Sequence, residues 1–130
     1  MNPNQPDRML MVYNADEGLF NALNDWAHKF FSPETYECPL CRFTYGVTSM
    51  LMPWKTFIQG QTFPVSFHYR PYFRKSFSQF DALALPLILV ESAGKIEPLV
   101  LAEEIKKTGG LIGLINLVQI RLDDWKPPSP

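Results

Sequence analysis

The chain has 130 residues, the length of one domain, and 46% of them are hydrophobic, which is enough to build a core without disulfide cross-links. Its 12 Lys and Arg residues are balanced by 13 Asp and Glu, so no excess charge attracts nucleic acid or an anionic membrane over a long range. The longest apolar runs, at 83–90 and 111–118, are far shorter than the roughly 20 residues of a transmembrane helix, and no secretory signal pattern is visible. We therefore expect a soluble cytoplasmic protein without nucleic-acid or membrane partners, whose two cysteines are reduced thiols or metal ligands.

The first part of the chain predicts a buried strand followed by an amphipathic helix. Residues 9–13 are a short apolar run that is typical of a buried strand. Asn14 and Glu17 then have the spacing of a capping box, which begins a helix. Apolar side chains recur at helical spacing across 19–31 and would form one face of that helix, and the Ser-Pro pair at 32–33 ends it.

The rest of the chain alternates short helical and extended patterns. The predicted elements are a helical turn at 53–58, a strand at 65–70, a short helix carrying Phe73, Phe77 and Phe80, a β-hairpin of 85–90 and 96–101 around a turn at 92–95, and a helix from 103 to 122 interrupted at Gly109 and Gly110. This order predicts an α/β domain at 8–124, with a disordered tail at 1–7 and a proline-rich tail at 125–130.

The order of elements resembles the thioredoxin-like superfamily over nearly the whole chain. Leu85-Pro86 stands at the entrance of the hairpin, where those proteins carry a proline preceded by a cis peptide bond. The stretches 13–16, 28–29, 32–41 and 44–46 are also similar to small bacterial proteins of no established activity that have a Cys-x-Leu-Cys motif after the first helix. The resemblance implies a mixed sheet of about four strands flanked by helices, ending in a hairpin and a C-terminal helix.

The cysteines do not occupy the position that the resemblance would give them. In redox-active thioredoxin-like proteins, Cys-x-x-Cys directly follows a strand and opens the next helix beside the cis-proline. Residues 14–17 take that place here, and Cys38 follows only after the first helix. A helix of about 13 residues is roughly 20 Å long. We therefore expect the cysteine pair to lie toward the opposite edge of the sheet from Pro86.

Cys38 and Cys41 are the sharpest chemical feature, and three interpretations stay open. As a thiol–disulfide oxidoreductase, the pair could close a small disulfide ring, with Cys38 attacking as a thiolate near Arg42 and Cys41 resolving. As a metal site, the pair would supply two of the four ligands of Zn²⁺, with His28 as a third. As structural residues, both thiols would pack as small hydrophobes on either side of Leu40.

Three further features each have a structural alternative. Asn14, Asp16 and Glu17 follow the first strand, where α/β proteins place ligand contacts, although helix capping also accounts for them. Aromatic and basic residues interleave at 67–75, as in platforms that stack single-stranded nucleic acid, but a strand followed by an amphipathic helix is the simpler interpretation. The apolar stretch at 54–63 would be a partner-binding or dimerisation patch wherever it is exposed.

Two functions from different classes follow from these observations. The first is a small thioredoxin-like protein whose Cys38 and Cys41 act in thiol–disulfide redox chemistry or bind Zn²⁺ together with His28. In that case His28 serves as a ligand, and otherwise it is a polar-face helix residue paired with Asn24 or Asp25. The second is a non-catalytic interaction module with structural cysteines, whose partner is another protein or a second copy of the chain.

Overall fold

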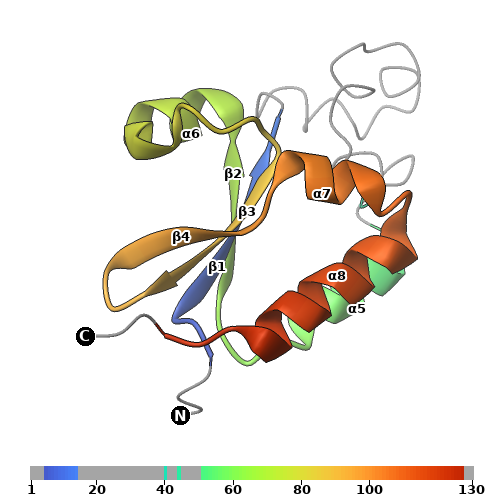
Figure 1. Ribbon diagram of the computed structural model, residues 1–130. Coiled ribbons are helices and arrows are strands. Elements are labelled where there is room, and N and C mark those ends of the chain that lie inside the picture. The colour runs from blue at the N-terminus through green and yellow to red at the C-terminus, as the bar shows by residue number, and fades with distance from the viewer. Residues whose placement is uncertain (1–4, 15–39, 41–43, 45–50, 128–130) are drawn as a thin grey trace.

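The computed structural model describes residues 5–14, 40, 44 and 51–127, and the statements below concern those residues. Figure 1 shows a sheet with α6 on one side and α5 and α8 on the other. The elements, labelled as in Figure 1, are β1 (Arg8–Tyr13), α5 (Met52–Gln59), β2 (Val65–Tyr69), α6 (Arg70–Ser76), the 3₁₀ helix η1 (Ser78–Phe80), β3 (Leu87–Ser92), β4 (Lys95–Val100), α7 (Ala102–Lys107) and α8 (Leu111–Asp124). None of these helices is long and apolar enough to cross a membrane.

The four strands form one mixed sheet in the order β2-β1-β3-β4. β1 runs parallel to β2 and antiparallel to β3, and β3 and β4 form the hairpin. The predicted fold class is confirmed, because a four-stranded mixed sheet is flanked by helices and ends in a hairpin and a C-terminal helix. The peptide bond between Leu85 and Pro86 is cis, as the resemblance implied.

The larger core lies between the sheet and the pair α5 and α8. Met9, Met11 and Tyr13 alternate along β1 and point to this side, because successive side chains of a strand face opposite ways. The same core contains Leu40, Trp54, Ile88, Val90, Leu99, Val100, Ile105, Leu114, Val118, Leu122 and Trp125. The apolar positions 114, 118 and 122 of α8 recur every four residues, so one stripe of that helix is buried.

The smaller core lies on the opposite side, under α6 and η1. Leu10 and Val12 of β1 point to this side and pack with Phe73, Phe80, Leu85, Leu87 and Leu89. The predicted helix carrying three phenylalanines is divided, because α6 ends at Ser76 and η1 holds Phe80. β1 and β3 are therefore buried on both sides.

The start of α6 differs from the sequence-based expectation, and two further positions depend on glycine or on a special backbone conformation. Arg70 begins α6 rather than ending β2, since Pro71 fits the first turn of a helix, where its missing N–H costs nothing. The hairpin turn has positive φ at Ala93 (53°) and Gly94 (82°), the conformation that a two-residue turn between twisted strands requires. Gly113 is a close-approach position, because a Cβ there would lie 2.5 Å from the carbonyl oxygen of Thr108.

One ion pair joins α7, α8 and β4. The Arg121 guanidinium donates to both oxygens of the Glu104 carboxylate, and its Nη1 also donates to the carbonyl of Leu99 over 2.9 Å. The Glu104 carboxylate accepts a further hydrogen bond from the Leu101 N–H over 3.0 Å. The hydrogen bond from Arg121, followed by that from Leu101, holds the pKa of the Glu104 carboxyl below its usual value.

We expect this ion pair to make stability depend on pH in the acid range. A carboxyl whose pKa is lower in the folded state adds stability that is complete above the unfolded value, about 4.3 for Glu, and is lost as the pH falls through the folded value. Because both side chains are about one third exposed, Glu104→Gln should cost only about 0.5–1 kcal/mol at pH 7. Urea unfolding of both proteins between pH 3 and pH 7 should show the two stabilities converging in acid. Glu103→Gln, a change at the exposed neighbour, should leave the wild-type pH profile unchanged, and a constant difference at every pH would contradict the assignment.

Candidate functional site

Three strand ends meet at one edge of the sheet. The last residue of β1 pairs with the last residue of β2, and its neighbour in β1 pairs with the first residue of β3. The residues that follow or precede these ends, Asn14, Arg70 and Pro86, therefore lie at the same edge. Arg70 Nη1 donates to Asn14 Oδ1 over 3.3 Å. This is the edge at which open α/β sheets bind ligands, and Asn14 is the one described residue of the predicted carboxylate and amide cluster.

An apolar pocket of about 290 Å³ opens at this edge of the sheet. β4 ends where β3 begins, so the start of α7 lies beside the loop that leads to Pro86. The apolar lining residues are Ala82, Leu83, Ala84, Leu101 and Ala102, and the charged ones are Glu103, Glu104 and Lys107. Leu101 is 41% exposed although it is a large hydrophobic residue. The arrangement suits an apolar group with a charged or polar neighbour.

Leu40, one of the two residues between the cysteines in the sequence, belongs to the larger core. Leu40 and Thr44 are both helical and both fully buried. The Thr44 hydroxyl donates to the Leu40 carbonyl over 2.6 Å, and the Tyr13 hydroxyl lies 3.4 Å from the Thr44 Oγ1 atom. The Leu51 N–H donates to the Thr44 carbonyl over 2.8 Å. These contacts attach the position between the cysteines to the end of β1 and to the segment that begins α5.

The predicted reactive residues lie outside the described part of the chain. The structure does not describe five of these residues, and their roles stay predictions: Cys38, Cys41, His28, Asp16 and Glu17. Among the residues that the structure describes, no three His, Cys, Asp or Glu side chains lie together as a metal site would require.

The two aromatic stretches contribute mainly to the cores. Trp54 is buried, and Phe57, Ile58 and Phe63 pack against the same core. In the stretch at 67–75, Phe67, Tyr69 and Phe73 pack in the two cores, whereas Tyr72 is 64% exposed. The core interpretation of both stretches therefore accounts for most of their aromatic side chains.

A serine and a histidine lie together on β2, which sequence reasoning did not single out. Ser66 Oγ lies 2.9 Å from His68 Nε2, and the His68 ring stacks on Tyr72 with 6.5 Å between centroids. Burial, followed by the positive charge of Arg8, lowers the pKa of the His68 imidazole. A neutral imidazole at pH 7 can accept a proton from the hydroxyl. Side chains two residues apart on a strand point to the same face. This spacing is the feature of the sequence that could have indicated the pair.

No protein family, curated protein or solved structure matches this chain in the comparisons made. The function has to be inferred from the residues and their arrangement.

Proposed function

We propose that this chain is a thioredoxin-like dithiol protein of the cytoplasm, in which Cys38 and Cys41 carry out thiol–disulfide exchange. The supporting observation is the attachment of Leu40, which is fully buried and whose carbonyl accepts a hydrogen bond from the buried Thr44. Successive Cα atoms are about 3.8 Å apart, so both cysteines lie within two residues of a fixed point of the core. Reactive groups held close to a rigid scaffold keep the geometry that their chemistry requires.

The proposed reaction consists of two exchanges. The Cys38 thiolate attacks a sulfur of a substrate disulfide, which forms a mixed disulfide and releases one substrate thiolate. The Cys41 thiolate then attacks the Cys38 sulfur, which releases the second substrate thiolate and leaves a Cys38–Cys41 disulfide. The substrate gains two electrons, its thiolates take up protons from water, and the protein loses two electrons. A cellular low-molecular-weight thiol would return the disulfide to the dithiol.

The test measures the reduction of a disulfide-linked peptide pair, with the thiol as the electron donor, by the wild type, Cys38→Ser and Cys41→Ser. We expect both variants to lose turnover. Cys41→Ser should accumulate a mixed disulfide that mass spectrometry detects, because its resolving thiol is absent, whereas Cys38→Ser should not. Ser92→Ala, a change on the β3–β4 hairpin, is the control that should keep wild-type turnover. Wild-type turnover in both cysteine variants would refute the proposal.

The metal interpretation is tested on the same preparations. Protein purified under reducing conditions is analysed for zinc, before and after exposure to a chelator. Zinc at one equivalent that is lost in Cys38→Ser, Cys41→Ser and His28→Ala would assign the pair to metal binding rather than to exchange. Metal-free protein whose stability does not change on chelation would exclude the zinc site.

A second candidate function is a protein-interaction module, and the pocket of about 290 Å³ beside α7 favours it. Its apolar lining and the exposed Leu101 suit an apolar side chain of a partner protein. A photoreactive residue in place of Leu101 should cross-link such a partner. The cross-link should be lost when Leu83→Glu is added and kept when both cysteines are replaced by serine. A cross-link that requires the cysteines, or a monomer that cross-links to nothing, would contradict this candidate.

A further inference from the structure

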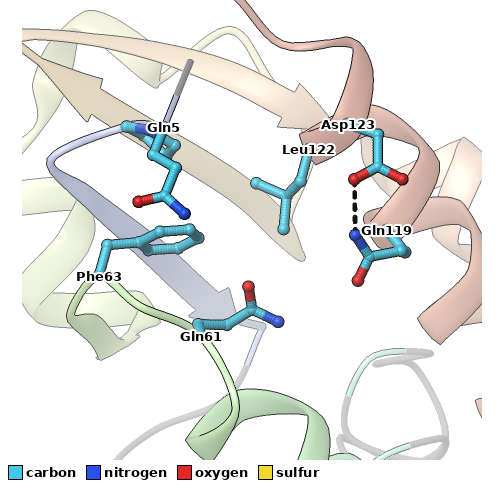
Figure 2. A pocket seen from close by; sticks show the side chains of 7 residues that line it. Gln5, Gln61, Phe63, Gln119, Leu122 and Asp123 are labelled. Atoms are coloured by element: carbon cyan, nitrogen blue, oxygen red, sulfur yellow. Dashed lines mark hydrogen bonds between the residues drawn. The ribbon is translucent and has the colours of Figure 1, made fainter. Parts of the chain in front are cut away.

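A second pocket, of about 250 Å³, lies at the opposite end of the sheet from Pro86. Its walls come from three separate parts of the chain. Gln5 precedes β1, Gln61 and Phe63 lie between α5 and β2, and Gln119 and Asp123 lie in the last turns of α8. Figure 2 shows the three side-chain amides and the carboxylate around the same space. The convergence of four polar side chains from distant segments distinguishes this pocket from an ordinary surface hollow.

The hydrogen bonds of the lining residues leave three side-chain oxygens able to accept from a ligand. Gln61 donates from Nε2 to the Phe57 carbonyl over 3.0 Å, and Gln119 donates from Nε2 to Asp123 Oδ1 over 2.8 Å, as Figure 2 shows for the second bond. Each bond uses one of the two N–H donors of its amide, and the amide oxygens of Gln61 and Gln119 and the second carboxylate oxygen of Asp123 can accept further hydrogen bonds. A ligand that engages these three oxygens must supply several donors.

The charge of the pocket favours a cation. Of the described residues that line it, Asp123 is charged and none is Lys or Arg. The last turn of α8 adds the partial negative charge of a helix C-terminus, which favours cations. A phosphate or carboxylate ligand would meet a carboxylate and no counter-charge. The site therefore selects against anions and in favour of a positively charged donor.

The volume of the pocket limits the ligand to a small group. The pocket volume of about 250 Å³ is below the roughly 300–1,000 Å³ of sites for drug-sized ligands. A guanidinium group is small, planar and permanently charged, and its five N–H donors point in several directions. An ammonium has three donors on one atom and cannot reach acceptors on opposite walls as readily. Phe63 supplies an aromatic wall that is compatible with a cation.

We propose that this pocket binds a guanidinium group, with Asp123 as the counter-ion and the amide oxygens of Gln61 and Gln119 as further acceptors. The group would come either from a small free guanidine or from an arginine side chain of a peptide. None of the described residues that line this pocket is a cysteine or a sequence neighbour of one, so the proposal does not depend on the chemistry of Cys38 and Cys41.

The test titrates the full-length protein with methylguanidinium and with N-methylurea, which has nearly the same shape but no charge. Side-chain amide signals of Gln61 and Gln119, observed by NMR, report binding at this pocket. Methylguanidinium should give saturable shifts, and N-methylurea should bind about two- to fivefold more weakly, because a charge pair at an exposed carboxylate contributes up to about 1 kcal/mol. Equal binding of the two compounds, or no saturable shift, would overturn the proposal.

Two variants localise the effect. Asp123→Asn keeps the oxygen that accepts from Gln119 but removes the charge, so methylguanidinium should bind about two- to fivefold more weakly. Asp124→Asn removes the neighbouring charge on the same helix, outside the pocket lining, and should bind as the wild type does. Similar weakening in both variants would show non-specific attraction and contradict the site. A blocked Gly-Arg-Gly peptide identifies the source: binding tighter than that of methylguanidinium assigns the pocket to a peptide arginine, and weaker binding assigns it to a free guanidine.

Discussion

Replacing Leu40 by alanine is expected to lower the free energy of unfolding by about 2–5 kcal/mol, as truncation of a fully buried leucine does. Leu40 has no exposed surface and packs in the core that also holds Trp54 and Tyr13. The lost methyl groups would leave a cavity beside the hydrogen bond between Thr44 and the Leu40 carbonyl. Urea unfolding followed by fluorescence or circular dichroism measures the change.

The matched control for this substitution is Leu101→Ala. Leu101 is 41% exposed, so its truncation should change the free energy of unfolding by about 0.5 kcal/mol or less. A loss below about 1 kcal/mol for Leu40→Ala would place that side chain outside the core. It would also remove the observation that supports the dithiol proposal, because the cysteines would no longer flank a fixed residue. Both variants are measured with the two cysteines changed to serine, so that disulfide formation does not alter the free energy of unfolding.

Phe73→Ala is expected to lower the free energy of unfolding by about 3–5 kcal/mol, the range for removal of a buried aromatic ring. Phe73 is fully buried and stacks against Phe77 at 5.2 Å and against Phe80 at 6.2 Å between ring centroids. It joins α6 to the strand residues Leu10 and Val12, so its loss opens the smaller core along its whole contact with the sheet. The same urea unfolding experiment measures the change.

The neighbouring Tyr72 supplies the control for Phe73. Tyr72 is 64% exposed and its ring stacks on His68 at the surface, so Tyr72→Ala should cost less than about 1 kcal/mol. Comparable losses in the two variants would mean that α6 is stabilised by its helical conformation rather than by its buried face. A small loss for Phe73→Ala alone would mean that the smaller core closes again around the vacancy.

The elements that the sequence predicted correctly are those with a strong periodic pattern. β1 is an uninterrupted apolar run that is buried on both faces, and the hairpin has a turn at 92–95 between two apolar segments. The break between α7 and α8 lies at the glycine pair, where Gly109 has a φ of 74°. These elements could be predicted because the residues that bury a face or adopt a special backbone conformation are neighbours in the chain.

The boundary between β2 and α6 shows where local pattern was insufficient. Alternation of apolar and polar residues continues through Arg70, which favoured a strand, but Pro71 belongs to the first turn of the helix and Arg70 begins it. The hydrogen bond from Arg70 to Asn14 at the end of β1 accompanies this arrangement. These two residues are 56 positions apart, so a pattern read over a short stretch of sequence cannot predict their contact.

By itself, the amino-acid sequence determined the fold class and the pairing of the two hairpin strands, because these depend on residue type and short-range spacing. The tertiary structure alone decided the sites. The pocket of about 250 Å³ joins Gln5, Gln61 and Asp123, and the apolar pocket joins the loop before Pro86 to the start of α7. Side chains from segments that are distant in the chain meet only once the sheet has set its order and the helices have packed on it, so neither pocket is visible in the linear pattern.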